Sequence, residues 1–241
     1  MSRAAVLRVI GAIGERGVLI GGQAISWWAE HYLARGRLTV AAGSLYTSKD
    51  VDLLARDADA RLLARDVAIV VGGVVNGSFK PRWNSLLAAR VEFVDGAAKR
   101  EVDVLRRMNG LLASDVFANA VRFDATGESA PVFVIHPVLL LEQRLHLMAE
   151  VEGYQTEHAV AQARLAIAVA RERLLDELED GWSAARKMMG RALEVATAER
   201  AHRLAERHAI EPLDALPDAH PNFPQAYLTE QRPRMLARRR R

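Results

Sequence analysis

A short apolar run that ends in two glycines constrains the fold of this chain more than any other feature. Val18, Leu19 and Ile20 have the apolar, largely β-branched character of a buried strand, and Gly21 and Gly22 follow directly. The next dozen residues carry apolar side chains at helical spacing: Ala24, Trp27, Trp28 and Tyr32. This pattern predicts a strand, a tight turn and a helix. Such a turn lets backbone amides and the positive helix end approach a phosphate; the alternative is a turn that only needs small residues.

A pair of carboxylates follows about two dozen residues later, in the segment SKDVDLL. Asp50 and Asp52 are two residues apart, at the start of a predicted strand over residues 51–54. Alternate residues of a strand share one face, so both carboxylates can point at one divalent cation. Alone, the D-x-D pattern is also typical of a solvated strand face or a turn.

A third acid is predicted on a β-hairpin further along the chain. Residues 91–94 and 101–105 read as two strands joined by an Asp-Gly turn, and Glu101 and Asp103 share a face of the second strand. Phosphoryl and nucleotidyl transfer need acidic side chains that hold one or two Mg²⁺ ions. We therefore predict Asp103 as the third metal ligand, with Glu101 as the alternative.

Taken together, the glycine pair, S-x-D-V-D and the hairpin strand V-D-V-L resemble the nucleotidyltransferase fold of the DNA polymerase beta superfamily, most closely its AbiEii toxin-like branch. The resemblance covers roughly the first 150 residues. It implies a glycine turn that faces the phosphates, a serine or threonine two residues before the first aspartate, and three aspartates that hold Mg²⁺ or Mn²⁺. The matching positions are Gly21, Gly22, Ser48, Asp50, Asp52 and Asp103.

The resemblance also bears on the helix that begins at His136-Pro137. Family members often place a lysine seven residues beyond such a proline, and here that residue is Arg144. The resemblance implies that Arg144 keeps a positive charge near a triphosphate; a surface arginine on an amphipathic helix is the alternative. A later Lys-Asp cluster of the family is replaced by GYQTEHAV at residues 153–160. A binding module that keeps the fold without turnover is therefore a second hypothesis.

The chain is predicted to have a mixed front and a helical back. Strands and helices alternate before residue 136, and three- to four-residue apolar spacing continues beyond it, including one helix from 182 past 204. The expected class is α+β, with a small mixed-sheet nucleotidyltransferase core and flanking helices, followed by a helical C-terminal bundle. The predicted divisions are an α/β core, a helical domain, and a proline-rich extended segment with an arginine tail: 1–136, 137–210 and 211–241.

Composition excludes several classes of chemistry. The sequence has no cysteine, which excludes disulfides, thiolate zinc sites and cysteine nucleophiles and agrees with a reducing compartment. It has no G-x-S-x-G motif, which argues against a serine hydrolase of that type. No apolar run is long enough to span a bilayer and the N-terminus lacks a signal-peptide core, so we expect a cytoplasmic protein without membrane contact.

Basic charge is concentrated at the C-terminus. From Thr229 onward the chain carries six arginines and one acid, which more than accounts for its net charge of +3. Such a tail binds RNA by displacing counterions or simply solubilises the chain.

Our predicted function is metal-dependent transfer of a nucleoside monophosphate from a nucleoside triphosphate to an RNA (for example tRNA) or protein hydroxyl. The resemblance implies a toxin–antitoxin or phage-defence setting with a cognate partner protein. RNA binding through the tail is a further alternative.

Overall fold

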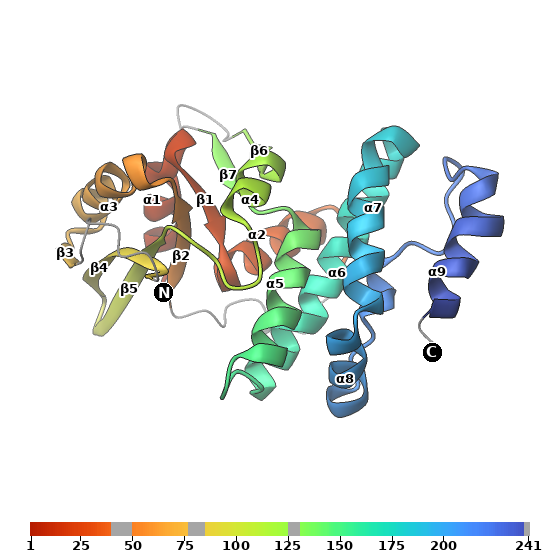
Figure 1. The fold of residues 1–241 in the computed structure, drawn as a ribbon. Helices are drawn as coiled ribbons and strands as arrows, with labels where there is room; N and C mark the ends of the chain where they lie inside the picture. Colours follow the sequence, from red (N-terminus) through yellow and green to blue (C-terminus); the bar gives the residue numbers. More distant parts are fainter. Residues whose placement is uncertain (40–49, 77–84, 125–130, 239–241) are drawn as a thin grey trace. The chain divides into compact units, whose positions relative to one another are not determined.

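A computed structural model gives the fold of this chain (Figure 1). The described residues are 1–39, 50–76, 85–124 and 131–238. The chain forms two compact units, made of Met1–Trp27 with Ala42–Leu140 and of Trp28–Ala41 with Leu141–Arg241. The predicted α+β class, a mixed sheet with flanking helices followed by helices in the C-terminal part, is confirmed. The predicted boundaries after residues 136 and 210 stay a prediction of domain organisation.

The first unit is built on a mixed sheet. In the described residues it has seven strands in the order β3-β4-β5-β2-β1-β7-β6. β2 is antiparallel to β1 and parallel to β5, and β1 is parallel to β7. The strands are β1 (Gly17–Ile20), β2 (Val51–Ala55), β3 (Val74–Asn76), β4 (Leu87–Asp95), β5 (Ala98–Leu105), β6 (Val121–Phe123) and β7 (Val132–Val134). The predicted β-hairpin is therefore confirmed as β4 and β5, with both strands longer than expected.

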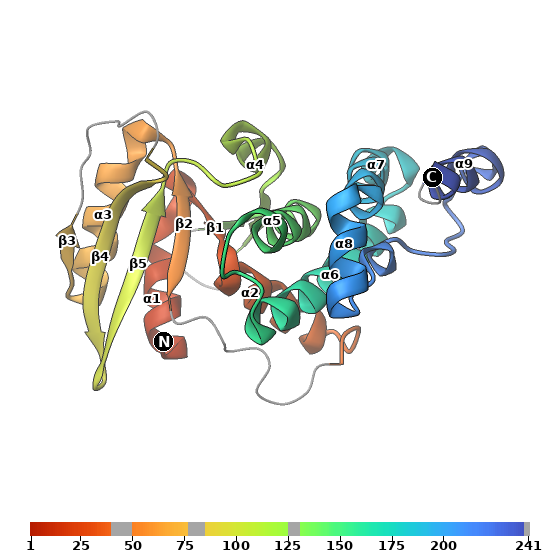
Figure 2. The ribbon, with the colours of Figure 1, turned by 60° about the horizontal axis from the view of Figure 1, so that its bottom comes forward.

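Helices α1 (Arg3–Ile13) and α3 (Asp57–Val71) pack against each other and against one face of this sheet (Figure 2). The burial of alternate residues on β4 follows from this, since Val91 and Phe93 are buried while Glu92 and Val94 are exposed. Residues 67–71 form the end of α3, which Gly72 closes with a left-handed backbone. One face of the β4–β5 hairpin thus remains polar.

Three further helices follow or precede strands of the sheet. α2 (Gly21–Ala34) begins immediately after β1, as predicted, and α4 (Ala113–Asn119) precedes β6. α5 (Pro137–Glu150) begins at the predicted proline, where buried His136 accepts a hydrogen bond at Nδ1 from the Val138 amide, 3.1 Å away. The division between the two units falls within α2 and α5.

The second unit is helical. It contains α6 (Glu157–Glu179), α7 (Trp182–Thr197), α8 (Glu199–His208), η2 (Pro212–Ala215), η3 (Tyr227–Gln231) and α9 (Arg232–Arg238). The single helix predicted from 182 past 204 is wrong, because the extended backbone of Ala198 separates α7 from α8. None of the helices in the described ranges is both long and apolar enough to cross a membrane.

The proline-rich segment, predicted as extended over residues 211–227, contains the short helix η2, and the residues after it, predicted as an arginine tail, form η3 and α9 as far as Arg238. Aromatic packing explains the order of this segment, because the ring of Trp182 lies 5.9 Å from that of Phe223 and 4.7 Å from that of Tyr227. Pro233, which has no amide to donate, lies where the π-helical η3 passes directly into α9. The Arg232 guanidinium also contacts the Asp218 carboxylate at 2.7 Å.

One carboxylate fixes residues of the segment 28–39 within the second unit. The hydroxyl of buried Tyr32 donates to Asp176 at 2.8 Å, and Arg37 pairs with both Asp176 and Glu172. Burial raises the pKa of Tyr32, and the hydrogen bond to Asp176 raises it further. Asp176 therefore joins residues almost 140 positions apart in the chain.

We expect Asp176→Asn to lower the free energy of unfolding by about 1.5–3 kcal/mol, because the hydrogen bonds it weakens involve a charged acceptor. Thermal or urea unfolding measures the change. Asp180→Asn, at an exposed aspartate at the end of the same helix, is the matched control and should change stability by less than about 0.5 kcal/mol. Equal destabilisation by both substitutions would contradict a specific role for Asp176.

Candidate nucleotide and metal site

Two of the predicted aspartates meet across neighbouring strands. β2 and β5 are parallel, and their register pairs Asp52 directly with Asp103. Val51 and Val102 form the preceding pair, and both valines are completely buried. Because successive strand residues face opposite sides, the two aspartates point to the face opposite the valines. The third predicted acid, Asp50, lies in a bend one residue before β2.

The predicted glycine turn lies against one of these carboxylates. Gly21 follows β1 directly and has a left-handed backbone with φ of 67°. A Cβ at this position would lie 2.1 Å from an Asp52 carboxylate oxygen, so only glycine fits without a shift. Antiparallel pairing of Ile20 with Asp52 produces this approach. Gly22 is buried in the first turn of α2, where its carbonyl accepts a hydrogen bond from the Ser26 hydroxyl at 3.2 Å.

Arg90, on β4, binds the third aspartate. Its Nε and one terminal nitrogen donate to the two Asp103 carboxylate oxygens at 2.7 and 2.9 Å, and its other terminal nitrogen lies 2.8 Å from Glu101. These hydrogen bonds to Asp103 raise the pKa of Arg90, and the negative charges of Asp103, Glu101 and Asp50 raise it further, against a smaller opposing effect of burial. Arg90 is thus held in a strongly negative environment.

Arg90 was not among the predicted site residues, because the first hairpin strand was expected to begin one residue later, at 91. A strand that includes residue 90 places Arg90 on the same face as Glu92, opposite Asp103 in the antiparallel register. The alternation of Glu101 and Asp103 was visible in the sequence. Extending the predicted partner strand by one residue would have revealed the pairing.

The donor atoms at this end of the sheet suit a hard divalent cation, since Asp50, Asp52 and Asp103 offer carboxylate oxygens. Within the described residues, however, no three His, Cys, Asp or Glu side chains are gathered closely enough to hold a metal ion. Both oxygens of the Asp103 carboxylate already accept hydrogen bonds from Arg90. The three aspartates are therefore of a type that binds a metal ion, and one of them, Asp103, accepts hydrogen bonds from Arg90.

The other predicted site residues are not placed beside Asp52 as ligands. Ser48 lies outside the described residues. Glu101, the alternative third ligand, contacts Arg90. Arg144 belongs to the second unit, where its side chain is buried and donates a hydrogen bond to the Tyr154 hydroxyl at 2.6 Å.

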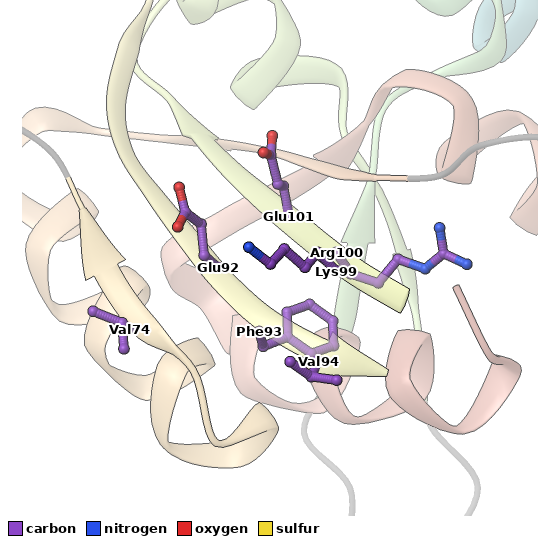
Figure 3. A pocket seen from close by; sticks show the side chains of 7 residues that line it. All are labelled: Val74, Glu92, Phe93, Val94, Lys99, Arg100 and Glu101. Carbon is purple, nitrogen blue, oxygen red and sulfur yellow. The ribbon is translucent and has the colours of Figure 1, made fainter. Parts of the chain in front are cut away.

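A pocket of about 450 Å³ lies along the β3–β4–β5 part of the sheet (Figure 3). Its lining combines two glutamates and two cations with apolar side chains: Val74, Glu92, Phe93, Val94, Lys99, Arg100 and Glu101. Glu92 and Glu101 are directly paired across β4 and β5, and Figure 3 shows their carboxylates extending from adjacent strands. The pocket includes Glu101, the neighbour of Arg90, and none of the three predicted aspartates lines it.

Comparisons with known proteins add two distant structural likenesses. The solution structure of the antibiotic-resistance factor ANT(2'')-Ia aligns with 86% of this chain and 92% of its own, at 14% identity and a TM-score of 0.41. The crystal structure of the Megavirus polyadenylate synthase aligns with 72% of this chain at 14% identity and a TM-score of 0.37, and this chain spans 33% of that protein. No protein-family model and no curated protein matches the sequence. With TM-scores below 0.5, the function proposed next rests on the carboxylate geometry.

Proposed function

We propose that this protein is a metal-dependent nucleotidyltransferase that moves a nucleoside monophosphate from a nucleoside triphosphate to a hydroxyl of RNA or protein. The observation that carries the proposal is the direct pairing of Asp52 and Asp103 on parallel strands, with the Gly21 turn against Asp52. Acidic side chains beside a turn that opens a helix combine a cation site with an anion site. Nucleotidyl transfer requires both at once.

In this proposal Asp50, Asp52 and Asp103 hold Mg²⁺ or Mn²⁺, which when bound neutralises triphosphate charge and favours attack by the acceptor hydroxyl. The chain's own residues bind and orient the substrate. The start of α2 at Gly21 and Gly22 offers its positive dipole end to the phosphates. The acceptor hydroxyl gives up its proton to solvent as its oxygen attacks the α-phosphorus, the bond from that phosphorus to the bridging oxygen breaks, and pyrophosphate leaves with that oxygen.

Arg144 remains a predicted phosphate contact, supported by its surroundings in the second unit. Its side chain is only 3% exposed, and its Nε has no hydrogen-bond partner among the described residues. Desolvation lowers the pKa of nearby His158, and the positive charge of Arg144 lowers it further. A buried cation whose described partner is the Tyr154 hydroxyl favours an anion as its missing partner.

A binding module without turnover is the second candidate, favoured by the contact of Arg90 with both oxygens of Asp103. The toxin–antitoxin or phage-defence setting, with a cognate partner protein, rests on the sequence resemblance alone. RNA contact through the C-terminal arginines predicts salt-dependent binding that is lost when the last ten or so residues are removed. Triphosphate binding by the remaining chain would separate that role from the carboxylate site.

The first test is Mg²⁺-dependent binding of the four ribonucleoside triphosphates by calorimetry. We expect the wild-type protein to bind at least one of them and the Asp50→Ala, Asp52→Ala double variant to lose the metal-dependent part, because its carboxylates are the proposed metal ligands. Glu15→Gln, at an exposed glutamate in η1, is the control and should bind like the wild type. Absence of triphosphate binding by the folded wild-type protein would refute the proposed function; binding without turnover would favour the binding module.

A further inference from the structure

All three guanidinium nitrogens of Arg90 contact carboxylate oxygens. Two of them form the paired hydrogen bonds to Asp103, and the third contacts Glu101. Parallel donation to both oxygens of a carboxylate is a strong and directional contact, which a lysine cannot reproduce. Arg90 therefore holds one fixed arrangement across β4 and β5.

This contact is partly exposed and adjoins the proposed metal site. Arg90 is about one-third exposed, with 37% of its side chain accessible, whereas the Asp103 side chain is only 19% exposed. Its partner Asp103 lies directly beside Asp52 in the sheet. Arg90 thus donates hydrogen bonds to the same Asp103 oxygen atoms that would bind the cation in the proposed reaction.

We propose that Arg90 is a built-in competitor of the metal ion at Asp103. The inference rests on the proposed function only in that the cation serves that reaction. While Arg90 donates to both Asp103 oxygens, these atoms are not offered together with Asp52 to a cation. The substrate-free protein then binds divalent cations weakly, and tight loading requires Arg90 to leave Asp103.

Arg90 has other anionic partners available when it no longer contacts Asp103. Glu101 stays within reach as one partner, and the anionic phosphates of a nucleotide bound at this end of the sheet supply the other charge. Binding of nucleotide and cation then support each other, because the anion draws Arg90 away from the atoms that the cation uses. Arg90 is accordingly a positioning residue that couples the two ligands.

The test measures Mn²⁺ binding to the full chain without nucleotide, from the loss of the electron paramagnetic resonance signal of free Mn²⁺. We expect Arg90→Gln to bind Mn²⁺ about tenfold or more tightly than the wild type, since a charge-assisted contact no longer competes. Arg90→Lys keeps the charge but loses the paired contact, and should show a smaller gain. Adding Asp103→Asn to Arg90→Gln should abolish the gain, because the freed atoms belong to Asp103.

Lys99→Gln is the matched control for charge alone. Lys99 lies on β5 on the same face as Glu101 and Asp103, because these three residues alternate along the strand with one residue between each. Its loss removes the same positive charge without freeing Asp103, so Mn²⁺ affinity should change by less than about threefold, an effect of screened surface charge.

An equal gain in Lys99→Gln and Arg90→Gln, or no gain in folded Arg90→Gln, would overturn the inference. If Arg90→Gln does not fold, as judged by circular dichroism, Arg90→Lys decides: unchanged affinity in that variant overturns the inference. A gain through Asp103 with no nucleotide transfer by any variant would support the competitor role and reject the proposed function. Nucleotide transfer by the wild type, with no gain in Mn²⁺ affinity in the Arg90 variants, would support the proposed function and reject the competitor role.

Discussion

Asp52→Asn will reduce nucleotide transfer by more than about a hundredfold, since loss of an outer partner of a metal ligand alone costs about 10–100-fold. The substitution replaces one carboxylate oxygen by an amide nitrogen, which donates where a cation needs an acceptor. Asp52 is also the residue that connects the three parts of the site. It pairs with Ile20 of β1 on one side and with Asp103 of β5 on the other, and its carboxylate lies against Gly21.

Transfer is measured as incorporation of label from an α-labelled nucleoside triphosphate into acceptor, once the binding experiment has identified the nucleotide. Asparagine has nearly the volume of aspartate, so thermal stability should stay within about 1 kcal/mol of the wild type. Glu15→Gln again reports the effect of removing a carboxylate elsewhere in the first unit. Undiminished transfer in folded Asp52→Asn would show that this carboxylate is not a metal ligand.

Gly21→Ala will destabilise the first unit and abolish nucleotide binding. A left-handed backbone with a side chain costs about 1–2 kcal/mol, and the Gly21 backbone has φ of 67°. The added Cβ also meets the Asp52 carboxylate, so Asp52 must move away from its present position. The melting temperature should therefore fall by at least several degrees, at about 2–4 °C per kcal/mol for a chain of this size.

Gly11→Ala is the matched control for this prediction. Gly11 lies inside α1, and a Cβ there meets no other atom within 4 Å. The same chemical change should stabilise the helix by about 0.5–1 kcal/mol, because alanine loses less conformational freedom than glycine. Differential scanning calorimetry compares the two variants. A Gly21→Ala protein that melts and binds nucleotide like the wild type would contradict the close approach to Asp52.

Local sequence patterns were sufficient for much of the first unit. The apolar run before Gly21, the helix after it and the strand at residue 51 were all predicted, and all are present. The β4–β5 hairpin was predicted from its Asp-Gly turn and alternating residues. These features depend on neighbours within a few positions, where backbone preferences and the two-residue period of a strand determine the conformation.

Local patterns failed where a distant contact decides the structure. The prolines of residues 211–227 predicted an extended segment but not its packing, and in the structure Phe223 and Tyr227 pack against Trp182, some 40 residues earlier. The position of Ala198 between two helices likewise has no breaker residue that could have predicted it. A propensity of a few tenths of a kcal/mol is readily outweighed by such packing.

The sequence by itself determined the chemical groups of the candidate site, namely the glycine turn and the alternating acids at residues 50, 52 and 103. Only the tertiary structure decided that Asp52 is paired with Asp103, that Gly21 lies against Asp52, and that Arg90 binds Asp103. Strand alternation fixes which residues share a face, whereas the register between strands some fifty residues apart is set by packing of the whole sheet. That register brings the acids together, and it also places a competing cation beside one of them.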